Sequence, residues 1–520
     1  MALPAPPRMA ATLPSSAVAP ALLLRRHTGA SLSSRCRRRW QRPAARRREG
    51  PGAPLGMRGA RELPPAAPDR CSGARGATPA AAAAGEAPYR GSEAQGSLWM
   101  VLLATAVVVC GSLEFGTCVG YSAPAQAGIV GDIGLSNSEY GVFASVLAIG
   151  AMIGALTSGR LADVLGRKMT MRFAAVVGIF GWLTVYFAKD AIMLYAGRVL
   201  LGYCTGVLSY VVPVFISEIA PKDIRGGLAT SNQLFICLGC SAAYIIGALL
   251  SWRSLVVVGL VPCVVLLVGL FFIPESPRWL ANIGREKEFH ASLQKFRGKD
   301  YDISEEATEI KGYIESNHRL PKARIQDLFQ RENIYAVTVG VSLMIFQQLG
   351  GINALGFYTS YIFSSAGFSG KLGITLIGII QIPITLVGAL LMDRSGRRAL
   401  LLVSSSGTFL GCFLTGFSFY FKVYYAAYSV GMGPVPWVIM SEIFSINMKA
   451  IAGGLVTLVS WIGSFAISYS FNFLMGWNPA GTFFLFSAAS LVTVLFVAKL
   501  VPETKGRTLE EIQASLQAST

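Results

Sequence analysis

Side chains that commonly carry out catalysis are few and scattered in this sequence. The three histidines, His27, His290 and His318, lie outside the long apolar stretches, and no group of His, Cys and acidic residues has the spacing of a metal site. Cys237-Leu-Gly-Cys240 has the spacing of a redox pair, but it lies inside an apolar stretch, where we interpret both cysteines as small packing residues. No Gly-rich loop is followed by Lys and Ser or Thr, so ATP hydrolysis is not predicted. We therefore expect no enzyme activity, no metal and no cofactor.

The composition is that of a membrane protein with many spans. Of the 520 residues, 53% are hydrophobic and 14% are charged, whereas a soluble chain carries about 25% charged residues. The apolar residues gather in stretches of about 20, the length needed to cross roughly 30 Å of hydrocarbon. These features exclude soluble enzymes, nucleic-acid-binding proteins and secreted disulfide scaffolds.

Residues 1–96 differ from the rest of the chain. They contain sixteen Arg, no Lys and five acidic residues, so most of the formal net charge of +17 lies there. The segment is rich in Ala, Pro and Gly and lacks the apolar period of a packed domain, which predicts disorder. Arg-rich, acid-poor character is typical of an organelle transit peptide, although Ser is sparse and no clear cleavage site is present. We retain two hypotheses for this segment, a plastid address and an inert extension.

Windows of about 19 residues predict twelve transmembrane helices. Those of an N-terminal half, residues 97–273, lie near 98–118, 139–158, 169–188, 191–216, 226–249 and 254–273. Those of a C-terminal half, residues 334–500, lie near 334–356, 372–392, 399–421, 423–440, 450–474 and 480–499. A charged linker, 274–333, joins the halves, and a tail, 501–520, follows them. Lys and Arg cluster after the second and eighth helices, whereas the loop at 119–138 has neither. The clustered loops, the linker and both termini are therefore predicted to face the cytosol.

Three pairs of motifs repeat between the halves. Gly159–Lys168 recurs at Asp393–Arg398, Ser217–Ile219 at Ser441–Ile443, and Pro274–Arg278 at Pro502–Lys505. The same order at nearly one offset indicates a duplication, and the shared sidedness requires an even number of spans in each copy. Two parallel six-helix repeats, each built from inverted three-helix units, are typical of alternating-access transporters.

The motifs as a set resemble the sugar porter family of the major facilitator superfamily. Besides the repeated motifs, they comprise Arg198 with Gly202 and Gly206, Pro213–Pro221 with Arg225-Gly226, Gln347-Gln348 with Gly351–Asn353, and Gly433–Trp437. They extend over residues 98–510, and Gly111–Ser122 further resembles the plant ERD6-like branch of monosaccharide transporters. The resemblance implies an all-α membrane protein with the major facilitator fold. It also implies transport of monosaccharides, such as glucose, by alternating access.

A sugar site accounts for the polar residues inside the predicted spans. Sugar hydroxyls both donate and accept hydrogen bonds, so reversible binding favours side-chain amides and one aromatic platform over charges. The resemblance implies that the cavity is lined by Gln233, Gln347, Gln348, Asn353 and Gln381, and that Trp437 stacks on the ring. The alternatives are that the amides join helices and that Trp437 belongs to an interfacial belt. We expect Gly433–Pro436 to break the tenth helix, which is tolerated beside a cavity.

A second set of residues resembles the ion-pair network that latches the cytosolic side of this family between its halves. The set is Arg160, Arg167, Glu218, Arg225, Glu275, Arg278, Arg394, Arg398 and Glu442. Exposed pairs contribute only about 0 to 1 kcal/mol each, so we expect the latch to act as a network near balance. Anchoring to lipid headgroups is the alternative.

The sequence departs from the resemblance where protons would be coupled to transport. Proton-coupled members usually carry Asp at the position of Cys118, near the residue equivalent to Arg198. Glu114 lies one helical turn earlier on a similar face, and an intramembrane carboxylate is a functional candidate by default. We interpret Glu114 as a static partner of Arg198 and expect facilitated diffusion. Proton symport through Glu114 is the alternative, and a non-transporting sugar sensor is a further one.

Other departures concern the second half. Ser460 and Ser464 stand where the family often places Asn, and their shorter hydroxyls predict a lower affinity or a different preferred sugar. The tenth helix is predicted to be too short, with Lys422 as the sole charge between Arg398 and Glu442. We therefore suspect a deletion or a gene-model error at 421–424.

The expected partners are a small monosaccharide, the lipid bilayer and, under the alternative, protons. Nucleic acid is not expected, and we predict a monomer. The tonoplast and the plastid envelope are the favoured membranes, with the plasma membrane as an alternative.

Overall fold

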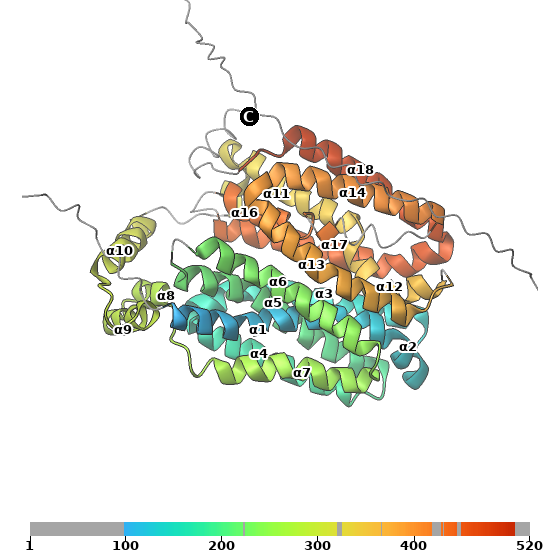
Figure 1. Cartoon of the computed structure of the whole chain (residues 1–520), viewed down its shortest axis with the longest axis horizontal. Coiled ribbons are helices and arrows are strands. Elements are labelled where there is room, and N and C mark those ends of the chain that lie inside the picture. The colour runs from blue at the N-terminus through green and yellow to red at the C-terminus, as the bar shows by residue number, and fades with distance from the viewer. Residues whose placement is uncertain are drawn as a thin grey trace, which may run out of the picture. The chain divides into compact units, whose positions relative to one another are not determined.

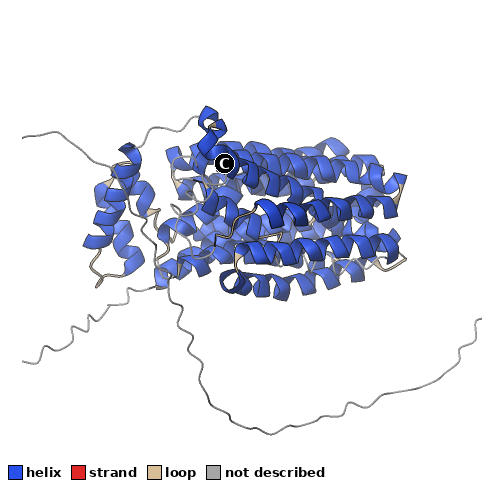
Figure 2. Ribbon diagram, turned by 90° about the horizontal axis from the view of Figure 1, so that it is seen from above, coloured by secondary structure: helices blue, strands red, loops and turns tan. Residues whose placement is uncertain are grey.

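A computed structural model describes residues 98–221, 224–319, 325–365, 367–418, 428–429, 431–444 and 449–504. Within these ranges the chain is almost entirely helical and contains no strand (Figure 2). Eleven helical segments of the described part are long and apolar enough to cross a membrane. The prediction of an all-α, multi-pass membrane protein is confirmed.

Six long helices form the N-terminal half (Figure 1). They are α1 (Trp99–Gly120), α3 (Asn137–Leu165), α4 (Arg167–Tyr186), α5 (Ala191–Ile219), α6 (Arg225–Gly247) and α7 (Trp252–Gly269). The prediction of a loop over 119–138 is wrong for most of its length, because α2 (Ser122–Ile133) follows α1 with only Tyr121 between them. Tyr121 keeps helical backbone angles, and the chain leaves the helix at Gly134, whose φ is +75°.

The C-terminal half contains two interrupted spans. Its helices are α11 (Arg331–Leu349), α12 (Ile352–Ser365), α13 (Gly370–Ser395), α14 (Arg397–Ser418), α16 (Val435–Ile443), α17 (Lys449–Trp477) and α18 (Pro479–Leu500). The span predicted at 334–356 is broken between α11 and α12, where Gly351 has a φ of +83°. A turn at 431–434 precedes α16, as Gly433–Pro436 predicted. Much of the predicted tenth span, including the suspected deletion at 421–424, lies outside the described residues.

Short helices of the linker pack on the N-terminal half. They are α8 (Pro277–Asn282), α9 (Glu286–Arg297) and α10 (Ser304–Arg319). The 3-10 helix η1 (Ile325–Phe329) instead packs against α11 and α17, and its Leu328 joins the core of the C-terminal half. Arg297 forms an ion pair with Glu306 at 2.6 Å and donates a hydrogen bond to the carbonyl oxygen of Ile219 at 3.1 Å. Phe296 joins the apolar core near the cytosolic ends of α1 and α5. These contacts attach α9 to the ends of α1 and α5.

The halves pack differently at their two ends. At one end a single apolar core joins them and includes Tyr140 and Phe143 from the first half with Tyr358 and Phe471 from the second. The Asn472 amide reinforces this side by donating to the carbonyl oxygen of Asn137 at 2.9 Å. At the opposite end, the described residues form two separate cores, one in each half. If this end faces the cytosol, as the charged loops predict, the arrangement is an inward-facing one.

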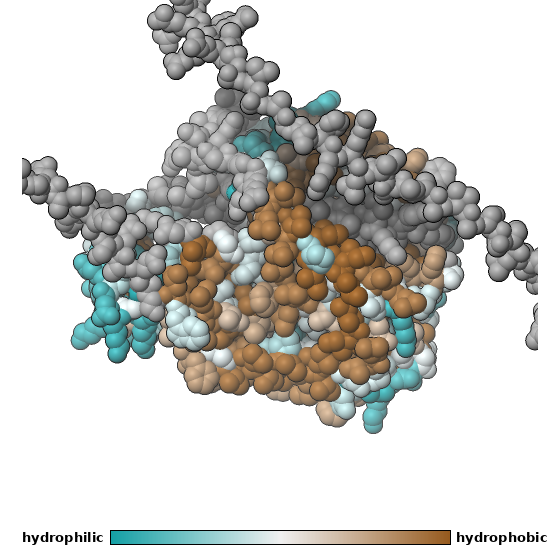
Figure 3. Space-filling model, viewed as in Figure 1, coloured by the Kyte–Doolittle hydropathy of each residue, from teal (hydrophilic) through white to brown (hydrophobic). Residues whose placement is uncertain are grey.

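The outer surface carries large apolar side chains. Along α4 and α7, Phe180, Val257, Val261 and Val265 are exposed. Figure 3 shows these helices within a continuous apolar face, with hydrophilic residues gathered towards its ends. Exposed apolar patches of this extent mark an interaction site, and here they match the length of a bilayer core.

Candidate functional site

A chain of neutral polar side chains lies at the break between α11 and α12. The Asn353 amide donates to Gln348 Oε1 at 2.6 Å, and Gln348 Nε2 donates to Ser460 Oγ of α17 at 3.0 Å. Gln347 and Gln348 are 3% and 5% exposed. We call these four residues, Gln347, Gln348, Asn353 and Ser460, the amide cluster. The structure thus brings together four of the residues predicted to bind sugar.

Two glycines allow this cluster to form. At Gly351 the positive φ is strained for other residues, and an added Cβ would lie 2.7 Å from the Phe486 ring. At Gly463 an added Cβ would lie 2.9 Å from Cβ of Gln348. Gly351 therefore permits the bend that places Asn353 beside Gln348, and Gly463 lets Gln348 approach α17.

Gln347 uses its amide differently from Gln348. Its Nε2 donates to the carbonyl oxygens of Met432 and Gly433 in the turn before α16, at 2.8 and 3.2 Å. The alternative interpretation of the amides as interhelical links therefore describes Gln347 in this conformation. Trp437, the third residue of α16, is partly buried against the core of the C-terminal half.

Gln233 and Gln381 meet at a second place, the contact between α6 and α13. Gln233 Nε2 lies 3.8 Å from the Cys237 sulfur, Thr385 donates to the same sulfur at 3.4 Å, and Gln381 also hydrogen-bonds with it. Hydrogen bonds to sulfur are weak. These two predicted residues thus lie at the contact between the halves, where they have only weak partners.

Several buried polar atoms in the described part have no hydrogen-bond partner. They include Gln381 Oε1, Ser464 Oγ and the indole nitrogen of Trp461. Buried polar groups are rarely unsatisfied, so these atoms are candidates to contact a bound ligand or water. The ring centroid of Trp461 also lies 6.0 Å from that of Phe115, which belongs to the other half. Trp461 was not among the residues predicted to line the site. Its place directly after Ser460 was the signal that could have identified it.

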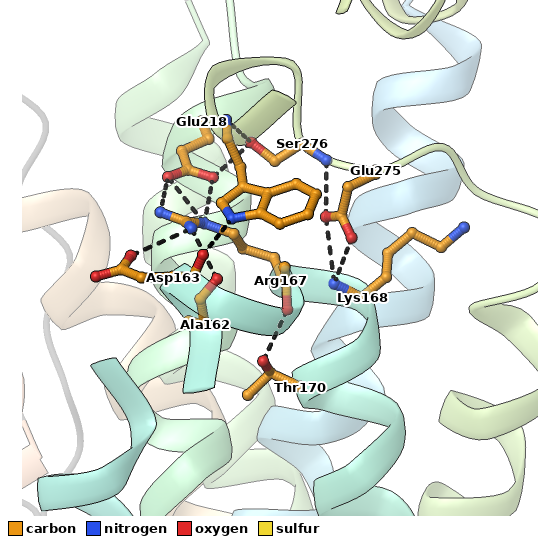
Figure 4. Close-up of polar contacts among 10 residues, drawn as sticks. Ala162, Asp163, Arg167, Lys168, Thr170, Glu218, Glu275 and Ser276 are labelled. Atoms are coloured by element: carbon orange, nitrogen blue, oxygen red, sulfur yellow. Dashed lines mark hydrogen bonds and ion pairs between the residues drawn. The ribbon is translucent and has the colours of Figure 1, made fainter. Parts of the chain in front are cut away.

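At the end of the bundle predicted to face the cytosol, Arg167 and Glu218 form a bidentate ion pair (Figure 4). Arg167 Nε lies 3.0 Å from Oε2 and Nη2 lies 2.8 Å from Oε1, with both side chains only 12% exposed. The Ser276 hydroxyl donates to Glu218 at 2.5 Å, and the Trp279 indole donates to the carbonyl oxygen of Asp163 at 2.9 Å. The pair therefore ties α4, α5 and the start of α8 together.

Two carboxylates cap equivalent helices in the two halves. Glu275 accepts from the Lys168 backbone N–H at 3.1 Å, and Glu503 accepts from that of Arg397 at 2.9 Å. Each lies at a helix N-terminus, where negative charge is favoured. Burial raises the pKa of Glu275 above its usual value, and backbone hydrogen bonds from Ser276 and Lys168 partly offset this. Glu503 was missed, although the repeat of the Pro274 and Pro502 motifs could have identified it.

The glycines before these helices are matched as well. Gly166 and Gly396 both have a φ of +88°. An added Cβ would lie 2.9 Å from Glu275 Oε2 in the first half and 2.8 Å from Glu503 Oε2 in the second. The repeated motifs therefore build the same capped helix start twice.

The described latch residues contact their own half. Arg398 donates to the carbonyl oxygen of Ala498 at 2.5 Å, Arg278 lies 5.9 Å from the Tyr313 ring, and Arg160 is exposed. The side chains of Arg225, Arg394 and Glu442 lie outside the described part. The expected contacts between the halves are not seen among the described members, because the apolar cores of the two halves are separate at this end.

Glu114 and Arg198 do not form the predicted pair. Both are 0% exposed, but Glu114 Oε1 accepts from the Trp182 indole at 2.6 Å and the Cys118 thiol at 3.0 Å. Arg198 donates to the carbonyl oxygen of Cys118 at 2.9 Å and to the Ser122 hydroxyl. The interpretation of Glu114 as a static partner of Arg198 is therefore wrong. Trp182 comes from α4, and spacing along α1 could not show its approach.

The family described as "Sugar (and other) transporter" matches residues 103–516. The chain therefore belongs to this family of membrane transporters, as the motifs predicted. Among its relatives, Sugar transporter ERD6-like 16 of Arabidopsis thaliana is 56% identical over 82% of this chain and 93% of its own length. Sugar transporter ERD6-like 7 of the same plant is 52% identical over 80% of this chain and 94% of its own. The prediction of the ERD6-like branch is confirmed.

Solved structures share the fold. The xylose transporter XylE from E. coli in an inward open conformation aligns with a TM-score of 0.67 at 25% identity, over 80% of this chain and 99% of its own. The proton:xylose symporter XylE bound to 6-bromo-6-deoxy-D-glucose gives the same TM-score at 24% identity, over the same shares of the two chains. The major facilitator fold is thus confirmed.

Proposed function

We propose that this protein carries monosaccharides across a membrane by alternating access, with hexoses such as glucose as the substrate class. The observation that carries the proposal is the amide cluster: a buried chain of neutral donors and acceptors on a broken helix, in a member of the sugar transporter family. Charges are absent from the cluster, so a neutral polyol can exchange hydrogen bonds with it at little cost. Nothing in the cluster suits an ionised substrate.

In this mechanism the sugar replaces hydrogen bonds that the cluster now makes with itself. Its hydroxyls take over the bonds among Gln348, Asn353 and Ser460, while Gln381 Oε1 and Ser464 Oγ accept further ones. Trp437 offers an apolar face to the ring. Return to the outward-facing state requires the cytosolic cores to meet and the core shared on the other side to open.

For the driving force of transport, our first candidate is facilitated diffusion down the sugar gradient. Proton symport through Glu114 remains the second candidate, and one observation favours it: the carboxylate is buried and its Oε2 has no partner in the described part. The buried Arg198 side chain forms no ion pair with Glu114 in the described part. Because no cation holds the Glu114 carboxylate in its charged form, this group can exchange a proton with a neighbouring group.

Uptake into proteoliposomes separates these candidates. Purified protein is reconstituted, and uptake of labelled glucose, fructose and xylose is followed with and without an inward proton gradient. Uptake that ends when internal and external sugar are equal supports facilitated diffusion. Accumulation above the external concentration only under a proton gradient supports symport, and failure to bind or carry any monosaccharide contradicts the proposed function.

We place the protein in the tonoplast or the plastid envelope as a monomer surrounded by lipid, with the plasma membrane as the alternative. The Arg-rich composition of residues 1–96 supports the plastid hypothesis. A fusion of residues 1–96 to a fluorescent protein tests it in plant cells. Import into plastids supports a transit peptide, and a diffuse cytosolic signal contradicts it.

A further inference from the structure

The turn at 431–434 is held from two sides. On one side, the Met432 backbone N–H donates to Ser404 Oγ of α14 at 2.7 Å. On the other, Gln347 Nε2 of α11 donates to the carbonyl oxygens of Met432 and Gly433. Gly431 makes the α14 contact close, since an added Cβ would lie 2.6 Å from the Leu400 carbonyl oxygen.

The turn determines where α16 begins. Val435 N–H donates to the Gly431 carbonyl oxygen at 2.9 Å, so the first turn of α16 is built directly on the held residues. Trp437 lies in that first turn, and Glu442 lies near the other end of the same helix. A shift of the turn would therefore displace a sugar-platform residue and a cytosolic latch residue together.

Gln347 cannot use both hydrogens of its amide nitrogen for the turn and also donate to a sugar. Its amide nitrogen carries two hydrogens, and both carbonyl oxygens of the turn are within hydrogen-bonding distance of it. A sugar hydroxyl that accepts from Gln347 must replace at least one of these bonds. Ser404 contacts the turn from the opposite side and is not part of the amide cluster, so its bond to Met432 survives.

We propose that Gln347 is a sugar-responsive tether: sugar binding draws its amide away from Met432 and Gly433 and frees α16 on that side, while Ser404 acts as the permanent anchor of the turn. This inference rests on the proposed function, because it needs a ligand rich in hydroxyls at the amide cluster. It assigns Ser404 a positioning role and gives Gln347 a role in transmission beyond contact with the sugar.

Hydrogen–deuterium exchange in the segment 428–444, measured by mass spectrometry on the full-length protein in detergent, tests the anchor without sugar. Ser404→Ala removes the acceptor of the Met432 N–H, and loss of one hydrogen bond predicts exchange roughly five- to tenfold faster in this segment. Ser405→Ala is the matched control, because Ser405 is equally buried but bonds to Leu401 O of its own helix. Equal exchange in the two variants would overturn the anchor.

Sugar addition tests the tether. Saturating glucose should speed exchange in 428–444 of the unmodified protein and leave α5 unchanged. In Gln347→Leu the segment 428–444 should exchange faster even without sugar, and adding sugar should not speed its exchange further. Unchanged or slower exchange on sugar binding would overturn the tether.

Binding is measured separately by the shift in thermal unfolding temperature on adding glucose. If this shift occurs for the unmodified protein but exchange does not respond, the tether fails while the proposed function stands. If glucose, fructose and xylose all give no shift, the proposed function fails and the tether with it. The Ser404 comparison without sugar decides the anchor in either case.

Discussion

The two halves hold their buried polar side chains in different ways. In the N-terminal half, Glu114 and Arg198 lie on uninterrupted helices and bond to groups of that same half. In the C-terminal half, Gln347 and Gln348 end a helix that breaks before Gly351, and Gln347 bonds to a second break at 431–434. Backbone at a helix break lacks some hydrogen bonds of a continuous helix, so polar groups there can shift more readily with a ligand. From this comparison we expect the first half to act as a rigid frame and the second as the responsive side.

The largest expected effect tests the responsive side. Gln348→Ala leaves Asn353 and Ser460 without their partner, and an unsatisfied buried polar group costs about 1–3 kcal/mol. This predicts a KM for sugar uptake roughly ten- to a hundredfold higher in proteoliposomes. Gln126→Ala removes a buried amide from α2 in the N-terminal half as a control. An equal loss in the control would remove the distinction between the halves.

The next prediction concerns the helix break itself. Gly351→Ala forces a residue with a Cβ to adopt a φ of +83° beside Phe486, which should lower the free energy of unfolding by about 1–3 kcal/mol. Gly453→Ala is the matched control within α17, because an added Cβ there meets nothing within 4 Å. Thermal unfolding in detergent measures both. A Gly351→Ala variant as stable as the control would show that the break is not required.

A smaller effect tests the rigid frame. Arg167→Gln removes a bidentate, largely buried ion pair between helices of the first half and should lower the free energy of unfolding by about 1–2 kcal/mol. Arg285→Gln, which breaks the exposed pair with Glu288, should cost no more than about 0.5 kcal/mol. Thermal unfolding of the two variants side by side provides the measurement. If the free energy of unfolding falls by the same amount in both variants, the Arg167–Glu218 ion pair does not stabilise the N-terminal half.

The smallest effect is expected at Glu114. Glu114→Gln keeps an oxygen that accepts from the Trp182 indole, so sugar exchange in proteoliposomes should be unchanged between pH 5.5 and 7.5. The measurement is equilibrium exchange of labelled sugar at each pH. Loss of exchange together with loss of a pH dependence present in the unmodified protein would instead make Glu114 the coupling residue and the first half an active partner.

Much of the site could be predicted from residue types. The amides were identified because the motifs around them resemble those of a sugar transporter family, and the Gly433–Pro436 break because helix breakers are conspicuous inside an apolar span. The break at Gly351 was missed, because a single glycine pair within an apolar run also fits a continuous helix. The predicted partner of Glu114 was wrong. The position of a residue on a helical face indicates where its side chain points, but it does not identify the residue that approaches from another helix.

The sequence by itself determined most of the spans and the fold class, because these depend on local composition and on spacing along the chain. The sidedness and the sugar chemistry of the site stay predictions from the same sequence. Only the tertiary structure decided that Gln347 bonds to a turn 85 residues away, that Trp182 donates a hydrogen bond to Glu114, and that the described residues of the two halves share a large apolar core at one end. Such choices depend on which helices approach one another and at what distance. Hydrogen bonds from nitrogen to oxygen usually span about 2.7–3.2 Å, a scale that no periodicity in the sequence specifies.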